Sequence, residues 1–279
     1  MSIVLSPPYR STRGRKPSRP AFLYRFHEAS GTTVADAFGN GPSLVLDGSE
    51  GSIWTPRGAF NPPALNSTNR WRPGAADPLR DYPAQVLDFL TPGAAFIAWA
   101  YYYRTAGSTG YETILSLGRD GSSYGGVAFR TGTGGGNSFW MRGTGAGNGT
   151  NFAGNQASNN AWSTLVWHCA VTAAGLTVQS FLNANTQPEW VGLWTNNGNA
   201  IPASMALFAA NGAGLCIGAL GSSNTLANYS SHLRSTASGA AVHNVGAIKI
   251  DAPNVGLALD LAVEFGRYPR AVNEILAGL

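Results

Sequence analysis

The residues with the clearest potential for chemistry are two acids, Asp260 and Glu264, in the apolar run LALDLAVEF. Two carboxylates about 5–5.5 Å apart can hydrolyse a glycosidic bond with retention of configuration. If the run forms a strand, however, the two side chains share one face and lie about 13 Å apart along it. We therefore interpret Asp260 and Glu264 as a structural pair, assign no catalytic residues and expect a protein that is not an enzyme. A glycoside hydrolase that uses this pair is the alternative.

Aromatic and amide side chains gather in two long segments, 60–84 and 184–204, which we predict to be surface loops. Aromatic faces beside planar amides suit sugar binding, whereas loop tryptophans are also typical of protein interfaces or can cover a sheet edge. We predict glycan- or partner-binding residues in these segments, namely Trp190, Trp194, Asn196, Asn197 and Trp71.

Few other residues suggest metal or thiol chemistry. Asp36 and Asn40 could offer oxygen ligands to calcium, or Asp36 could form an Asx turn that holds the loop. We name no cofactor and no metal ligand, and keep calcium as an alternative. Cys169 and Cys216 lie in apolar runs, so we expect two buried thiols, with a disulfide between neighbouring strands as the alternative. His168, on an apolar strand, is expected to be a hydrogen-bonded core histidine.

Positive charge is concentrated at the N-terminus. Five basic residues and no acid lie within residues 1–20, namely Arg10, Arg13, Arg15, Lys16 and Arg19. Without them the net charge of +4 becomes −1, from 13 basic and 14 acidic residues, so we expect no nucleic-acid binding by the body of the protein. We interpret residues 1–20 as a proline-rich arm whose basic residues dock onto a larger assembly. A solvated tail is the alternative.

Short runs of β-branched and aromatic residues recur between turn signals along the rest of the chain, which contains 36 glycines and 16 prolines. They predict strands at 22–28, 43–47, 85–90, 95–104, 112–117, 126–131, 138–142, 163–173, 176–183, 214–219, 241–250 and 257–266. The last ten residues, RAVNEILAGL, have the period of a helix. We therefore predict one all-β domain, residues 21–279, with a short C-terminal helix.

Seven segments in this order resemble the laminin-G-like and concanavalin-A-like lectin/glucanase domain family. They are LYRFHEASGTTVADAFGNG (23–41), GSIWTPRGAF (51–60), FIAWAYYY (96–103), ETILSLG (112–118), WHCAVTAAGLTVQSFLNA (167–184), LCIGA (215–219) and LAVEFGRYPRAVNEILAGL (261–279). The resemblance implies a two-sheet antiparallel jelly-roll sandwich. It also implies a binding or structural module for glycans or proteins, sometimes with calcium, although some relatives are glycosidases.

The N-terminus contains no apolar run of the kind that forms a secretory signal, and no segment approaches the roughly 20 apolar residues of a membrane span. We therefore hypothesise a bacteriophage virion protein (a decoration, fibre or tail-associated protein) without enzymatic activity and without membrane contact. Its arm would bind other virion proteins, and its sandwich, as a homo-oligomer in the particle, would contact proteins or host-surface glycans. A glycan-binding lectin module is the alternative.

Overall fold

The computed structural model describes the chain in segments. These are residues 21–26, 28, 31–39, 43–47, 54–55, 58–60, 70–73, 89, 92–104, 112–120, 126–131, 136–142, 150–156, 161–187, 189–193, 215–218, 220–222, 229–230, 241–250 and 252–267. The predicted arm, residues 1–20, and the predicted C-terminal helix, residues 270–279, lie outside them.

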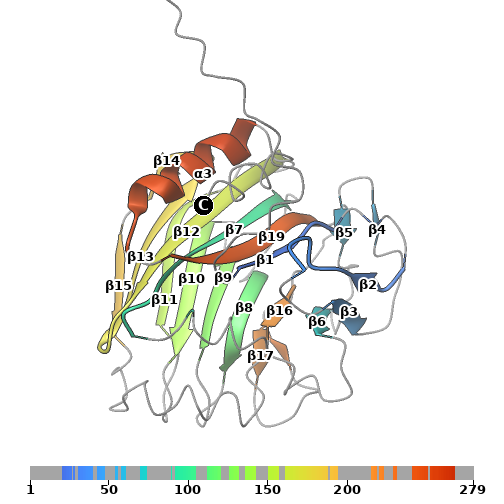
Figure 1. Cartoon of the computed structure of the whole chain (residues 1–279), viewed down its shortest axis with the longest axis horizontal. Coiled ribbons are helices and arrows are strands. Elements are labelled where there is room, and N and C mark those ends of the chain that lie inside the picture. The colour runs from blue at the N-terminus through green and yellow to red at the C-terminus, as the bar shows by residue number, and fades with distance from the viewer. Residues whose placement is uncertain are drawn as a thin grey trace, which may run out of the picture.

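The described part is a sandwich of two sheets with one helix on its outside (Figure 1). The first, which we call the A sheet, has the order β14-β13-β12-β7-β19-β5-β4, with β1 beside β19 and β15 beside β13. Its strands are β1 Ala21–Tyr24, β4 Trp54–Thr55, β5 Gly58–Phe60, β7 Ala95–Arg104, β12 Ala161–Val171, β13 Gly175–Leu182, β14 Asn185–Thr186, β15 Trp190–Leu193 and β19 Ala241–Ile250.

The second, the B sheet, has the order β11-β10-β9-β8-β16-β6-β3-β2, with β17 paired to β8 and β18. Its strands are β2 Thr33–Val34, β3 Leu44–Asp47, β6 Arg70–Pro73, β8 Glu112–Asp120, β9 Gly126–Thr131, β10 Gly136–Arg142, β11 Thr150–Gln156, β16 Leu215–Ile217, β17 Leu220–Ser222 and β18 Tyr229–Ser230. The pairs within both sheets are antiparallel, apart from the parallel pair β17–β8. The predicted all-β antiparallel sandwich is therefore confirmed.

The core lies between the sheets and follows the two-residue alternation of the strands. Phe96, Ala98, Ala100 and Tyr102 of β7 point inward, together with Trp167 and its alternate neighbours in β12. From the B sheet, Phe129 meets Trp167, with ring centroids 5.0 Å apart. Because every second residue of β7 and β12 enters this core, the residues between them face the outside of the A sheet.

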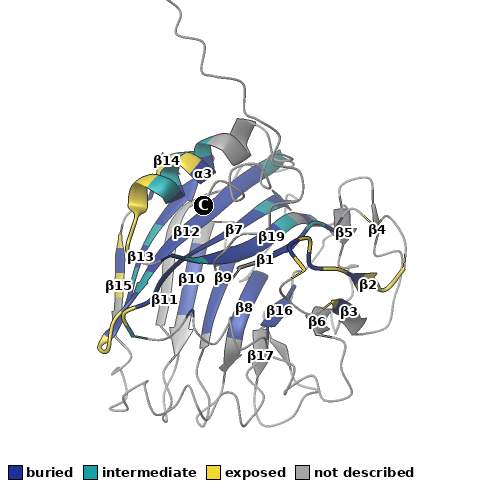
Figure 2. Cartoon of the chain, viewed as in Figure 1, coloured by how far each residue is buried: buried dark blue, intermediate teal, exposed yellow. Residues whose placement is uncertain are grey.

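The helix, α3 (Val255–Arg267), covers part of this outer face. Figure 2 shows exposed and intermediate residues on α3, which lies over strands β12 and β13 of the A sheet. Ala258, Leu261 and Ala262 pack with Val166 and Phe181 of the sheet in a second apolar cluster. The prediction of a strand at 257–266 was therefore wrong. A short apolar run has no unique period, and here the spacing of three and four residues prevails because one helical face is buried.

Three further predictions on elements need correction. Of the predicted strand 85–90, only Phe89 is described, and it lies outside any strand. The segment 60–84, predicted to be a loop, contains strand β6, and the segment 184–204 contains β14 and β15. No helix among the described residues is long and apolar enough to cross a membrane.

Candidate functional site

Three aromatic residues lie together on the outer face of the A sheet, on neighbouring strands. Tyr101 and Tyr103 alternate with the inward-facing Tyr102 in β7, and Trp162 stands opposite Tyr103 near the start of β12. Tyr101 and Trp162 are partly exposed, whereas Tyr103 is buried. We call Tyr101, Tyr103 and Trp162 the aromatic trio.

Trp162 holds the trio together through two ring contacts. Its ring stacks on that of Tyr101, with centroids 4.6 Å apart and planes 11° from parallel, and meets the Tyr103 ring edge-on at 5.5 Å. Such pairs contribute about 0.5–1.5 kcal/mol beyond the burial of their area. Partial burial also raises the pKa of the Tyr101 phenol, so this hydroxyl stays protonated and able to donate a hydrogen bond at neutral pH. The trio is thus a preformed aromatic surface with a polar rim.

An amide lies at the same end of β12. Asn183 and Ala184 both have positive φ, 49° and 66°, and form the tight turn between β13 and β14. The Asn183 Oδ1 accepts a 2.8 Å hydrogen bond from the backbone N–H of Thr164, and its Nδ2 donates to the Ser163 hydroxyl at 3.4 Å. Ser163 follows Trp162 in β12, and because side chains alternate along the strand it points to the opposite face, so these hydrogen bonds anchor the turn to β12 rather than place the amide on the trio.

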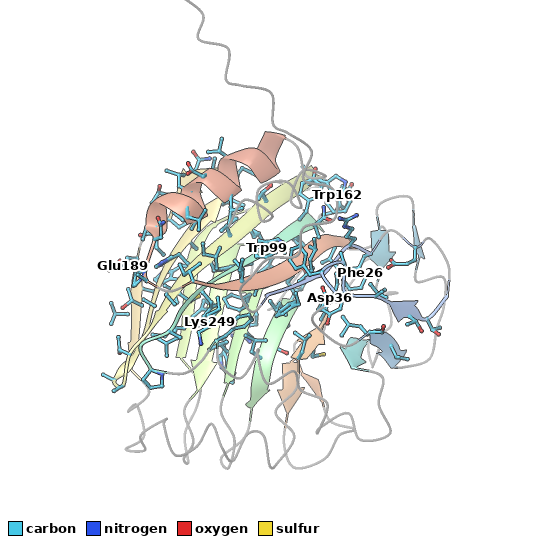
Figure 3. The ribbon with its side chains drawn as sticks, viewed as in Figure 1. Phe26, Asp36, Trp99, Trp162, Glu189 and Lys249 are labelled. Atoms are coloured by element: carbon cyan, nitrogen blue, oxygen red, sulfur yellow. The ribbon has the colours of Figure 1, made fainter. Side chains whose placement is uncertain are left out.

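Trp190, one of the predicted binding residues, occupies a different environment. Trp190 begins strand β15, pairs with Val178 and joins the core between the sheets with 8% of its surface exposed. Its ring is therefore largely covered, whereas the prediction placed it on a surface loop. Figure 3 labels Glu189, which precedes Trp190, and Trp162 at opposite ends of α3.

The other predicted binding residues are only partly within the described structure. Trp71 lies in β6, between Leu46 of β3 and Ile217 of β16, and the structure describes its backbone alone. Trp194, Asn196 and Asn197 lie outside the described residues. The same holds for the predicted docking residues Arg10, Arg13, Arg15, Lys16 and Arg19. Their roles stay predictions.

Two roles were considered for Asp36, a calcium ligand and an Asx turn, and the described contacts form the Asx turn. Its Oδ1 accepts hydrogen bonds from the backbone N–H groups of Phe38, at 3.1 Å, and Leu23, at 2.8 Å. The first closes an Asx turn and the second ties that turn to β1. Asn40 lies outside the described residues, which contain no group of three or more metal-ligating side chains.

Two expectations about buried polar residues are confirmed. Cys169 and Cys216 are both buried and are not joined in a disulfide, and burial raises the pKa of Cys169 well above its usual value. His168 is buried and hydrogen-bonded, as expected for a core histidine: its Nε2 accepts the Asn254 backbone N–H at 2.9 Å.

The two acids considered for glycoside hydrolysis belong to α3, so the strand geometry assumed for them does not apply. Asp260 is exposed and Glu264 follows one turn later in the helix. Positions 260 and 264 are one helical turn apart, so the strand separation of about 13 Å on which the structural interpretation was based does not apply.

The trio was missed because its contact links segments 61 residues apart, from Tyr101 to Trp162. Part of the trio could have been predicted from the segment YYYR, because residues 101 and 103 of one strand point to the same face of the sheet. The partner on the neighbouring strand could only be found from the register.

Comparison with solved structures places this sandwich among lectin-like folds. Trypanosoma rangeli sialidase in complex with sialic acid matches with a TM-score of 0.50 and 10% identity, over 87% of this chain and 32% of the sialidase. The binding domain of botulinum neurotoxin DC in complex with rat synaptotagmin II matches with a TM-score of 0.51 and 8% identity, over 88% of this chain and 51% of that one. A botulinum neurotoxin type C structure, described as interacting with two ganglioside molecules, gives the same values.

These matches establish the fold. The chain spans about a third of the sialidase and about half of the toxin chains. No protein-family model and no curated protein matches the sequence. The broad expectation of a lectin-like β-sandwich is therefore confirmed, whereas the comparisons add nothing for laminin-G or bacteriophage proteins.

The comparisons contradict the expectation that the chain is not an enzyme. Structures of a sialidase, which is an enzyme, are among the matches to this sandwich. The sequence argument against enzymatic activity also assumed a strand that is in fact a helix. The strand separation of Asp260 and Glu264, on which the exclusion of an enzyme was based, is therefore no longer an argument.

Proposed function

We propose that this chain is a carbohydrate-binding module and that the aromatic trio is its sugar-binding surface. The observation that carries the proposal is the partly exposed Tyr101–Trp162 stack on the outer face of the A sheet. A sugar ring has an apolar face of C–H groups and a rim of hydroxyls. Aromatic rings with polar tips complement both parts.

The fold also supports a function that involves sugars. Matching structures include a sialidase bound to sialic acid and a toxin described with gangliosides, so sandwiches of this shape are found in proteins that engage sugars. A preformed site also limits the entropic cost of binding, because the stacked rings are already held in place by one another.

Replacing Trp162 by alanine should weaken glycan binding about tenfold or more, equivalent to about 1.4 kcal/mol. The substitution removes the ring that contacts both tyrosines, whereas Trp162→Phe keeps an aromatic face and should lose less. We would screen the full chain on a broad glycan panel that includes sialylated oligosaccharides, then measure affinities by calorimetry.

Trp194→Ala is the matched comparison, because Trp194 is another predicted binding tryptophan and is not part of the trio. Unchanged circular dichroism and thermal unfolding would show that each variant is folded. Loss of binding in Trp194→Ala with full binding in Trp162→Ala would overturn the assignment to the trio. A panel without any saturable ligand would overturn the function itself.

A virion role through residues 1–20 is a separate proposal that rests on the basic, proline-rich composition of this segment. Deletion of residues 2–20 should abolish incorporation into a particle and leave glycan binding unchanged, because the trio belongs to the sandwich. Incorporation at the wild-type level after the deletion, measured by mass spectrometry of purified particles, would refute the anchoring role.

A further inference from the structure

The start of α3 is attached to the A sheet at one polar contact. Asn254 precedes the helix, and its backbone N–H donates to Nε2 of His168 in β12, at 2.9 Å. The side chain of the same residue caps the helix, since its Oδ1 accepts the Leu257 backbone N–H at 2.9 Å. Asn254 therefore joins the first turn of α3 to β12, and His168 is the acceptor on the sheet.

The contact is buried beside apolar surface. His168 is 3% exposed, between Ile97 of β7 and Gln179 of β13 in the register of the sheet. Beyond it, the buried face of α3 covers Val166 and Phe181. Asn254 itself is exposed, so loss of the hydrogen bond would cost most at the buried histidine, where water cannot easily replace the partner of Nε2.

We propose that His168 is a pH-dependent latch: protonation of its Nε2 removes the acceptor for the Asn254 amide and releases the start of α3 from the A sheet. A neutral imidazole accepts a hydrogen bond at its bare nitrogen, whereas both nitrogens of the imidazolium are donors. Two N–H groups would then face each other. The new charge would also lie at the N-terminus of α3, where the helix dipole is positive and disfavours a cation.

The surroundings of His168 favour its neutral form. Burial lowers its pKa below the ordinary value, opposed in part by a hydrogen bond with its own backbone and by the carboxylate of Glu189. The register neighbours Ile97 and Gln179 are uncharged, and Asp260, a charged residue in the described part of α3, is exposed. Among the described groups, Glu189 is thus the charge that acts on the latch.

The direction of the pH effect follows from the lowered pKa. As pH falls through about 6.5, the unfolded chain binds a proton at this histidine before the folded chain does, so acidification destabilises the folded state. The contribution of neutral His168 is fully present above about pH 6.5 and is lost as the pH falls through its folded pKa. This device is independent of the proposed glycan binding.

Hydrogen–deuterium exchange of the full chain at pH 7.5 and pH 5 tests the proposal. After correction for intrinsic exchange rates, we expect the protection of amides in the first two turns of α3 to fall about tenfold or more at pH 5, equivalent to about 1.4 kcal/mol. Amides in the centre of β7 should keep their protection. His168→Gln keeps a side-chain acceptor at every pH, so the pH dependence in α3 should disappear.

The matched control is His243→Gln, which removes a histidine from β19 and should retain the wild-type pH dependence. Equal protection of α3 at both pH values in the wild type, or pH dependence that survives in His168→Gln, would overturn the latch. A readout without any substitution is the ¹⁵N spectrum of the His168 ring at pH 7.5. A proton on Nε2 in that spectrum would also overturn it, because the accepted hydrogen bond requires this nitrogen to be bare.

Discussion

Replacing Gly246 by alanine should lower the free energy of unfolding by about 3 kcal/mol, as expected for overpacking of a rigid interior. Gly246 lies in β19 opposite Trp99 of β7. An added Cβ would lie 2.5 Å from the backbone carbonyl oxygen of Phe22 and 2.8 Å from Cε2 of the Trp99 ring, and it would also overlap Cζ2 of that ring. Trp99 is buried in the cluster beneath α3, and the Phe22 carbonyl belongs to β1, so neither can easily move away. Denaturant unfolding followed by tryptophan fluorescence would measure the change.

Gly256→Ala provides the matched control for that experiment. Gly256 lies in the first turn of α3, and the nearest atom to an added Cβ is Oδ1 of Asn254 at 3.5 Å, an ordinary contact distance. The variant should unfold at the wild-type denaturant concentration or slightly above it, because alanine favours helices over glycine. If Gly246→Ala also unfolds at the wild-type denaturant concentration, Trp99 and the Phe22 carbonyl do not pack as closely on Gly246 as the structure indicates.

The second large effect is expected at a carboxylate buried between the sheets. Tyr102 of β7 donates its phenolic O–H to Oε2 of Glu112 in β8 at 2.5 Å, and both side chains are buried. This length is typical of a charge-assisted O–H···O⁻ hydrogen bond. Tyr102→Phe should therefore lower the free energy of unfolding by about 2 kcal/mol, since the bond is lost and Glu112 stays buried.

A double-mutant cycle would separate this bond from the loss of packing. Glu112→Gln and the double variant, measured by denaturant unfolding, should give a coupling energy of the same order as the Tyr102→Phe effect. Thr131→Val removes a longer hydrogen bond, 3.4 Å, to the same Glu112 oxygen and should cost clearly less. A coupling energy near zero would show that Tyr102 and Glu112 do not depend on each other.

This pair also affects the proposed binding surface. Tyr102 lies between Tyr101 and Tyr103 in β7, so its inward hydrogen bond holds the strand segment that presents both rings outward. Weaker glycan binding in Tyr102→Phe would then accompany the lower stability, without any direct contact between Tyr102 and the sugar.

Much of the sheet structure could be predicted from local composition. The strands at 95–104, 126–131 and 241–250 have the predicted bounds, because long runs of β-branched and aromatic residues suit a pleated, buried surface. Shorter strands such as β2, β14 and β18 were missed, because two residues carry too little pattern to be distinguished from a turn.

The sequence alone determined the all-β class of the fold, since period-two alternation and turn residues are local properties that every strand carries with it. Only the tertiary structure decided which aromatic residues are accessible. Trp190 entered the core because β15 pairs with β13, and Trp162 met Tyr101 because β12 pairs with β7 in one particular register. It also decided that residues 255–267 form a helix, because the outer face of the A sheet offers an apolar surface to one side of that segment. Burial and ring contacts depend on pairings between distant segments, and those pairings are not encoded in any short stretch of the chain.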